Sequence, residues 1–205
     1  STASELMVYA DLAMYEAKKR GKNNACIFNI DMQKQAQRQL HLKNALQNGL
    51  ESNSIEVYYQ PIINTHNHQV TKIEALMRCP DPAGGYFNTE ELIQICEETS
   101  TIFDIDIAVL KKVNEDIELI KADCGDSKLG VSLNVSPNIF TCQTHLFNEW
   151  LFWLYESTSK TNVTLEITER ALLNKNTKTL SMFKDFKQRG IDIAIDDFGV
   201  GYSSL

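Results

Sequence analysis

The sequence predicts an α/β fold built on a parallel sheet or barrel, and three observations support this. Short strand-like runs alternate with helical stretches after an opening hairpin, in the order strand, helix, strand, helix. Within four of the five strand-like runs, apolar residues occupy every second position, so that each of these strands has one apolar face. The chain has 205 residues and is 43% hydrophobic, which is enough apolar material for a sizeable core.

The first fifty residues are predicted to form two helices separated by a short strand. A helix over residues 5–20 follows from apolar residues at helical spacing, three basic residues in the last turn and Gly21 directly after them. The run "ACIFNI" predicts a strand over 25–30. A polar amphipathic helix follows over 31–50. This second helix suits either a connector between two globular units or the first helix of the next domain.

From residue 51 the strand and helix signals alternate to the end of the chain. Five strands are predicted, over residues 55–62, 69–78, 129–136, 162–169 and 191–197. Helices are predicted between them, over residues 90–96, 105–120, 144–155 and 176–189. The first two strands are close enough in sequence to form a hairpin, whereas the later ones are each separated by a helix.

Charge and cysteine content narrow the class of protein. The net charge is −7, which argues against a protein that binds a nucleic acid polymer through its phosphates. A small anionic ligand stays compatible, because a metal ion can supply the positive charge. The five cysteines include no CxxC pair, so we expect reduced thiols in the cytoplasm rather than disulfides or zinc. No apolar run approaches the roughly 18 residues of a membrane span.

Four of the predicted strands carry an oxygen-bearing side chain opposite their apolar face. These side chains are Glu74, Asn134, Glu166 and Asp196. The last two intervals are 32 and 30 residues, one βα repeat each, and the first is 60. Each residue lies near the C-terminal end of its strand, where (β/α) barrels build their active sites. The pattern therefore predicts a single site assembled from four strands.

The chemistry of these side chains predicts a metal site. A charge that faces a barrel interior is costly unless it is paired or binds a metal. Oxygen ligands select hard ions such as Mg²⁺ or Mn²⁺ over zinc. Asp197 can join Asp196 only if the strand has ended and the backbone turns, for which "FGVG" is suited. One or two ions held in this way would suit the in-line attack of water on a phosphodiester.

Five motifs, taken in order, resemble the EAL domain of cyclic di-GMP phosphodiesterases. They are "YYQPI", "EALMR", "LNVS", "LEITE" and "AIDDFGVGYSSL". The resemblance runs from about residue 40 to the end. Before it, "ADLAMYEAKKRGKNNACIF" resembles the final helix and strand of a GGDEF (diguanylate cyclase) domain. The expected organisation is therefore a GGDEF terminus over 1–30, a connector or first EAL helix over 31–50, and the N-terminal part of an EAL barrel over 51–205.

The resemblance implies metal-dependent hydrolysis of cyclic di-GMP to linear pGpG in bacterial signalling. It implies a TIM-like (β/α)8 barrel, of which about five of eight strands are present, so we expect a truncated chain that is inactive alone. Glu74, Asn134, Glu166 and Asp196 would hold a first Mg²⁺ or Mn²⁺, and Asp197 a second, with Glu74, Asp196 and Asp197 catalytic. Arg78 would grip a substrate phosphate, Gln60 and Leu76 would contact the substrate, and Glu169 would brace the loop after Asp197.

The resemblance leaves a second function open and implies further partners. A degenerate EAL domain can act as a non-catalytic cyclic di-GMP receptor or regulatory interaction module. The expected partners are cyclic di-GMP, an upstream GGDEF domain and a second copy in a homodimer. A cytoplasmic location is expected, with upstream regions of the parent protein able to provide a membrane tether.

Overall fold

The structure is a computed structural model that describes residues 2–21, 23–99, 101–140, 145–169 and 177–199. It separates into two compact units, Ser1–Gln47 and Asn48–Leu205. Each unit is described by itself below. The second unit contains the sheet and all of the predicted site residues.

The first unit contains the predicted helix but lacks the predicted strand. Helix α1 (Ala3–Lys19) starts at a capping box, in which Glu5 N–H donates to the Thr2 hydroxyl and Thr2 N–H to the Glu5 carboxylate. The strand expected over 25–30 is wrong, because residues 24–29 have no regular secondary structure. A strand needs a partner for its backbone groups, and the described part of this unit offers none. Phe28 instead stacks on Tyr9, with ring centroids 4.1 Å apart.

The predicted second helix is present as α2 (Ile30–Glu51), which crosses the boundary between the two units. Leu42 and Leu46, one turn apart on the same side of α2, are its most buried side chains, whereas most of its other residues are exposed. Gly49 lies close to the start of the sheet domain, since a Cβ there would lie 2.9 Å from Cδ1 of Ile55. Whether α2 is a connector or a domain helix stays a prediction.

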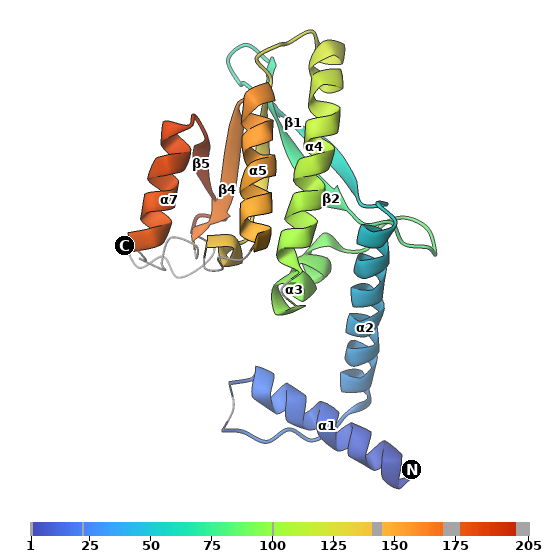
Figure 1. Cartoon of the computed structure of the whole chain (residues 1–205). Helices are drawn as coiled ribbons and strands as arrows, with labels where there is room; N and C mark the ends of the chain where they lie inside the picture. Colours follow the sequence, from blue (N-terminus) through green and yellow to red (C-terminus); the bar gives the residue numbers. More distant parts are fainter. Residues whose placement is uncertain (1, 22, 100, 141–144, 170–176, 200–205) are drawn as a thin grey trace. The chain divides into compact units, whose positions relative to one another are not determined.

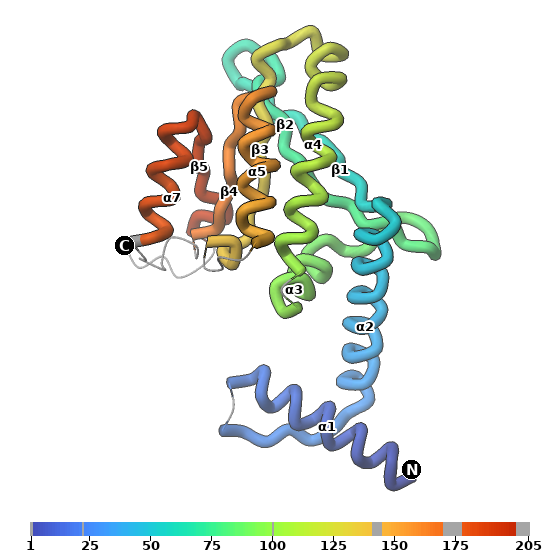
Figure 2. Tube along the Cα trace, in the orientation of Figure 1, coloured from blue at the N-terminus to red at the C-terminus, as the bar shows by residue number. Residues whose placement is uncertain are grey.

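The second unit is built on a five-stranded sheet in the order β1-β2-β3-β4-β5 (Figures 1 and 2). The strands are β1 (Glu56–Ile63), β2 (Val70–Arg78), β3 (Gly130–Val135), β4 (Val163–Thr168) and β5 (Asp192–Asp196). β1 and β2 form the antiparallel hairpin, and β2 to β5 are parallel. All five predicted strands are confirmed, as is the partial α/β sheet.

Helices connect the parallel strands. They are α3 (Thr89–Thr99), α4 (Ile102–Cys124), α5 (His145–Lys160) and α7 (Thr177–Gln188). Of these, α4, α5 and α7 cover one face of the sheet (Figure 1). A short 3-10 helix, η1 (Pro137–Phe140), follows β3. α4 is longer than predicted, and it ends where Gly125 takes a left-handed conformation with φ of 65°. α3 lies at the end of the sheet toward which the parallel strands run (Figure 1).

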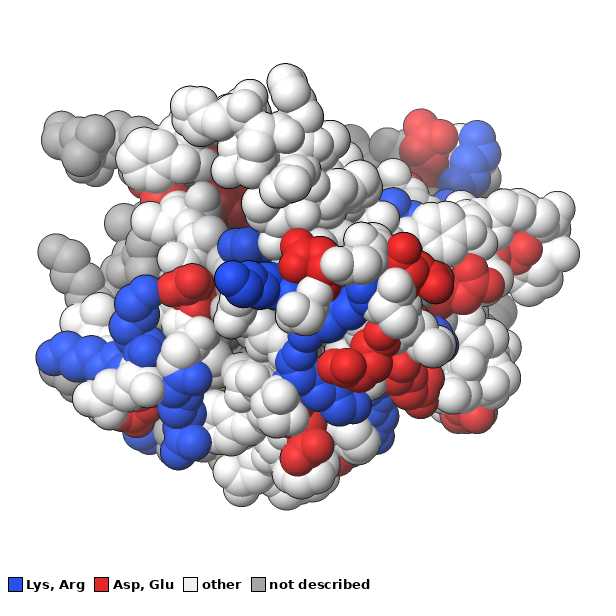
Figure 3. All heavy atoms as spheres, turned by 90° about the horizontal axis from the view of Figure 1, so that it is seen from above, with Lys and Arg blue, Asp and Glu red and all other residues white. Residues whose placement is uncertain are grey.

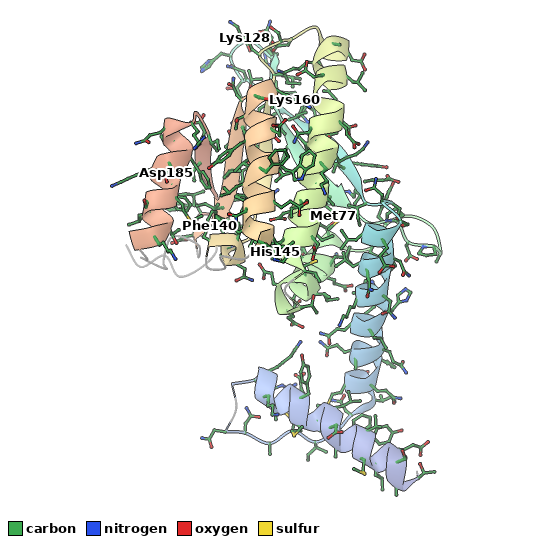
Figure 4. All side chains as sticks on the ribbon, in the orientation of Figure 1. Met77, Lys128, Phe140, His145, Lys160 and Asp185 are labelled. Carbon is green, nitrogen blue, oxygen red and sulfur yellow. The ribbon has the colours of Figure 1, made fainter. Side chains whose placement is uncertain are left out.

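The alternation of side chains along the strands sorts the two faces as predicted. On β2, Ile73, Ala75 and Met77 are buried, and the residues between them are only partly buried. Met77 lies behind α4 in Figure 4 and lines a cavity with residues of that helix. Trp150 of α5 is also fully buried. The apolar face of the sheet therefore packs under the helices, which leaves the other face free to carry the polar site.

The edge strand β5 departs from this pattern. Ile191, just before the strand, is fully buried as predicted, but Ile195 is 45% exposed. β5 pairs only with β4 among the described residues, and the helix packed against it, α7, precedes it in the chain. The far end of its apolar face is therefore uncovered in the described part of the chain.

The surface carries no large field of one sign in the view that Figure 3 gives. Lys and Arg side chains are interspersed with Asp and Glu over that face. Among the described residues, no helix is both long and apolar enough to cross a membrane.

Candidate functional site

Strand register places three of the predicted ligands side by side. Asn134 on β3 pairs directly with Glu166 on β4. Glu74 on β2 pairs with Ser132, one side-chain step before Asn134 on the same face. The step is bridged by a hydrogen bond, since the Asn134 side-chain amide donates to Oε1 of Glu74 at 2.8 Å. The sheet thus brings together residues that are 60 and 32 positions apart in the sequence.

The end of β5 brings two aspartates to the same place. Asp196 is the last residue of the strand and pairs with Thr168. Asp197 has a φ of 51°, and Gly199 has a φ of 91°, so the backbone turns at once. The expected turn is therefore present, but it begins at Asp197 itself, one residue before "FGVG". The second half of that motif lies outside the described residues. Gly199 N–H donates to the Glu169 carboxylate at 3.4 Å, which joins Glu169 to this turn.

A cavity of about 470 Å³ opens where the parallel strands end. Five of the predicted site residues line it: Leu76, Asn134, Glu166, Asp196 and Asp197. Gln60, Glu74 and Arg78 do not line this cavity. Gln60 on β1 pairs directly with Glu74, so the predicted substrate contact lies next to a predicted metal ligand. The predicted site residues therefore form a continuous row across the sheet rather than a single closed pocket.

The environment of Glu166 shows how negative charge gathers here. Partial burial is the main cause that raises the pKa of Glu166, and the nearby charges of Glu74 and Asp196 raise it further. The Ser132 hydroxyl and the Lys72 ammonium oppose this rise. Ser132 is buried, and its hydroxyl has no hydrogen-bond partner of good geometry among the described residues. A carboxylate flanked by two others is a place where a cation is stabilised.

Lys72 is a cation in this site that the sequence analysis missed. It lies two residues before Glu74 on the same face, and its Nζ donates to the Thr164 hydroxyl at 2.6 Å. The side chain spans β3 at Gly130, its direct partner, where no side chain blocks the way. The alternation that selected Glu74 also selects Lys72, so the signal was present in the sequence.

The predicted ligands do not form a closed metal cage. Among the described residues, no group of three or more His, Cys, Asp and Glu side chains has the spacing that would hold a metal ion. The Asn134 amide is turned so that its nitrogen faces Glu74, and Asp196 lies one side-chain step beyond Glu166 along the sheet.

Asp106 is an acidic residue that lines the cavity and that the sequence did not predict as a site residue. It lies on α4 among buried residues such as Ile102 and Leu110, one turn away on either side. Its Oδ2 atom is buried without a hydrogen-bond partner in the described part of the chain. Burial raises the pKa of Asp106 well above its usual value, and the charge of Glu97 adds to the rise. A carboxyl group on the apolar stripe of a helix was the signal that could have identified it.

Replacement of Asp106 by Asn is expected to stabilise the protein in a pH-dependent way. Below about pH 3.9 both folded and unfolded chains carry the proton, and the two variants should differ least. As the pH rises, the unfolded chain ionises while the folded one holds its raised pKa, so unfolding of the wild type is favoured. Near pH 7 we expect Asp106→Asn to raise the free energy of unfolding by about 1–3 kcal/mol.

Urea unfolding at pH 4, 5.5 and 7 measures this effect. The matched control is Asp123→Asn, since Asp123 is exposed on the same helix. A difference from wild type that is constant across pH, or that shrinks as pH rises, would contradict the assignment of a raised pKa to Asp106.

Comparison with known proteins connects this arrangement to a family. The EAL domain family matches residues 43–205. The bifunctional diguanylate cyclase/cyclic di-GMP phosphodiesterase MucR of Pseudomonas aeruginosa is 32% identical over 204 residues, which cover 100% of this chain and 30% of MucR. The cyclic di-GMP phosphodiesterase NbdA of the same organism is 29% identical over 202 residues, covering 98% of this chain and 26% of NbdA. The chain thus spans about a quarter to a third of these relatives.

Solved structures have the same fold. The PaMucR phosphodiesterase in complex with c-di-GMP has a TM-score of 0.68 and 27% identity, over 80% of this chain and 66% of that one. The EAL enzyme Bd1971 in its cAMP-bound form has a TM-score of 0.64 and 26% identity, over 86% of this chain and 50% of that one. The five-stranded sheet described above therefore corresponds to part of an EAL-type α/β fold.

Proposed function

This chain belongs to the EAL domain family, and from that premise we propose that it is part of a phosphodiesterase that hydrolyses cyclic di-GMP to linear pGpG. One observation carries the proposal. Oxygen-bearing side chains from β2, β3, β4 and β5 lie near the C-terminal ends of these strands, and those from β3, β4 and β5 line an open cavity. The names of MucR and NbdA as cyclic di-GMP phosphodiesterases support it.

The donor set fits a hard divalent cation. Every proposed ligand offers oxygen, and the pKa of Glu166 is raised first by burial and then by the nearby negative charges of Glu74 and Asp196, which a cation would offset. We propose that Mg²⁺ or Mn²⁺ is held by Glu74, Asn134, Glu166 and Asp196, with Asp197 available to a second ion. When bound, such ions supply Lewis acidity, which activates water and offsets the charge of the phosphate. The Asn134 amide would have to turn its oxygen toward the ion.

The remaining site residues would bind and orient the substrate. In the reaction, a water oxygen forms a bond to one phosphorus and the bond to the ribose 3′ oxygen breaks, which opens the ring. Arg78 makes no ion pair with a carboxylate among the described residues, so its guanidinium can bind the phosphate. Gln60, opposite Glu74, and Leu76, in the cavity wall, would contact the rest of the nucleotide.

Residues 1–30 are proposed to be the C-terminal end of an upstream GGDEF domain. The alignment with MucR, whose name includes diguanylate cyclase, covers the whole of this chain and supports that organisation. The described cysteines are free thiols, with Cys79 and Cys96 buried, which supports a cytoplasmic location. Assembly into a homodimer stays a prediction.

Incubation of the full-length protein with cyclic di-GMP tests the proposed function. We expect pGpG to form with Mg²⁺ or Mn²⁺, to stop when EDTA removes the metal, and to resume when the metal is restored; chromatography of the nucleotides measures it. Binding of cyclic di-GMP without any pGpG would support a non-catalytic receptor instead. A folded protein that neither binds nor cleaves the nucleotide would overturn both functions.

A further inference from the structure

Four side chains gather at the open end of the β1–β2 hairpin, where β1 begins and β2 ends. This end lies beside the candidate site. Glu56 on β1 pairs directly with Arg78 on β2. Tyr58, two residues further along β1, lies on the same face as Glu56. Tyr86 approaches from the loop after β2, where it forms an isolated antiparallel bridge with Pro80. We refer to Glu56, Tyr58, Arg78 and Tyr86 as the hairpin-end cluster.

The charged pair in the hairpin-end cluster does not form the ion pair that its register favours. Opposite charges on directly paired antiparallel residues attract, because their Cβ atoms lie only about 4.5–5.5 Å apart. The Glu56 carboxylate instead accepts a hydrogen bond from the Tyr86 hydroxyl at 2.8 Å. Among the described residues, no ion pair joins Glu56 to Arg78. Glu56 is therefore held by a neutral donor although a cation is its nearest strand neighbour.

The tyrosines are themselves held in place. The hydroxyl oxygens of Tyr58 and Tyr86 are 2.5 Å apart. Because the Tyr86 proton goes to Glu56, Tyr58 is the donor in this second bond. The two rings meet edge to face, with centroids 5.4 Å apart. Tyrosine hydroxyls are protonated at neutral pH, so Tyr86 is a donor there, and its hydrogen bonds to Tyr58 and Glu56 raise its pKa further.

Arg78 keeps most of its donors available. Its Nη1 donates to the Met77 carbonyl at 2.8 Å, and its Cζ lies 5.6 Å from the centroid of the Tyr58 ring. These contacts orient the guanidinium without neutralising its charge. A guanidinium has five N–H donors, so a fork remains for an anion. An ion pair with Glu56 would occupy that fork and oppose the binding of a phosphate.

We propose that Tyr86, supported by Tyr58, holds the Glu56 carboxylate away from Arg78 and so keeps Arg78 available for a phosphate of the nucleotide. Tyr86 and Tyr58 are then positioning residues, because they act through Glu56 and Arg78. This inference rests on the proposed function, in which Arg78 grips the substrate. It predicts that loss of the Tyr86 hydroxyl harms binding only while Glu56 carries its charge.

A double-mutant cycle in the full-length protein tests this inference. In Tyr86→Phe, Glu56 is released toward Arg78, and we expect the KM for cyclic di-GMP to rise about tenfold with kcat little changed. In Glu56→Gln there is no carboxylate to compete, and the KM should be at or below that of the wild type. The combination of Glu56→Gln with Tyr86→Phe should restore the wild-type KM. Tyr155→Phe, on α5 and outside the cluster, is the matched control.

The outcomes separate this inference from the proposed function. A Tyr86→Phe protein with the KM of the wild type would overturn the inference while the proposed function stands. So would a double variant that keeps the raised KM, because a merely structural role of Tyr86 would not depend on the charge of Glu56. Tyr86 is 42% exposed, so its variant is expected to fold, which circular dichroism checks. A wild type that does not bind cyclic di-GMP would overturn both.

Discussion

Glu166→Gln in the full-length protein is expected to lower the rate of cyclic di-GMP hydrolysis by about 10³-fold. The substitution keeps the size of the side chain and removes its negative charge, which is influenced by the charges of Glu74 and Asp196. Glu166 pairs with Asn134, and its pKa responds to both Glu74 and Asp196, so it is the residue that electrostatically links the proposed ligands. Loss of its charge should weaken metal binding and catalysis together.

Two measurements distinguish a functional role of Glu166 from a structural one. Isothermal titration with Mn²⁺ should show weaker binding in Glu166→Gln, and metal-free unfolding should show stability equal to or above wild type, because a repulsion has been removed. Glu156→Gln, an exposed carboxylate on α5, is the matched control and should leave both unchanged. Hydrolysis by Glu166→Gln within about tenfold of wild type would contradict the proposed role.

Trp150→Ala is expected to lower the free energy of unfolding by about 3–5 kcal/mol. Trp150 is 1% exposed and packs against two other rings, with centroids 6.0 Å from Phe147 and 6.2 Å from Phe186. It joins α5 to α7 and also lines the cavity, so its removal would leave a void between the helices and the sheet.

Urea unfolding monitored by circular dichroism measures this loss. Phe152→Ala is the matched control, because Phe152 lies on the same helix but is 55% exposed, and its loss should cost less than about 1 kcal/mol. If the two substitutions lowered the free energy of unfolding equally, packing of Trp150 between the helices and the sheet would not be a main source of stability.

Sequence periodicity predicted the sheet domain well and the first unit less well. In the sheet domain each apolar run had a partner, so alternation became strand pairing. The run over 25–30 had the same local pattern but no partner in the described unit, and it formed no strand. Helix ends were also misjudged, as at α4, since they depend on a cap at Gly125 and on tertiary contacts.

The candidate site likewise contains some residues that the sequence predicted and others that it did not. Alternation selected Glu74, Asn134 and Glu166 because the side-chain period of a strand is fixed at two. The period of two does not apply to Asp106, because this residue lies on helix α4. It could not select Tyr86, whose role depends on a loop that returns to the hairpin through its bridge with Pro80.

The amino-acid sequence by itself determined which side of each strand is apolar, where the oxygen-bearing side chains lie along their strands, and the resemblance to EAL domains. Each of these properties depends on residues two to four positions apart or on a short motif, so a short stretch of sequence is enough to recognise it. Only the tertiary structure decided that Asn134 faces Glu74, that Lys72 reaches Thr164 across Gly130, and that Glu56 bonds Tyr86 rather than Arg78. Strand register and the competition among hydrogen-bond partners distant in sequence set those contacts, and no local pattern encodes them.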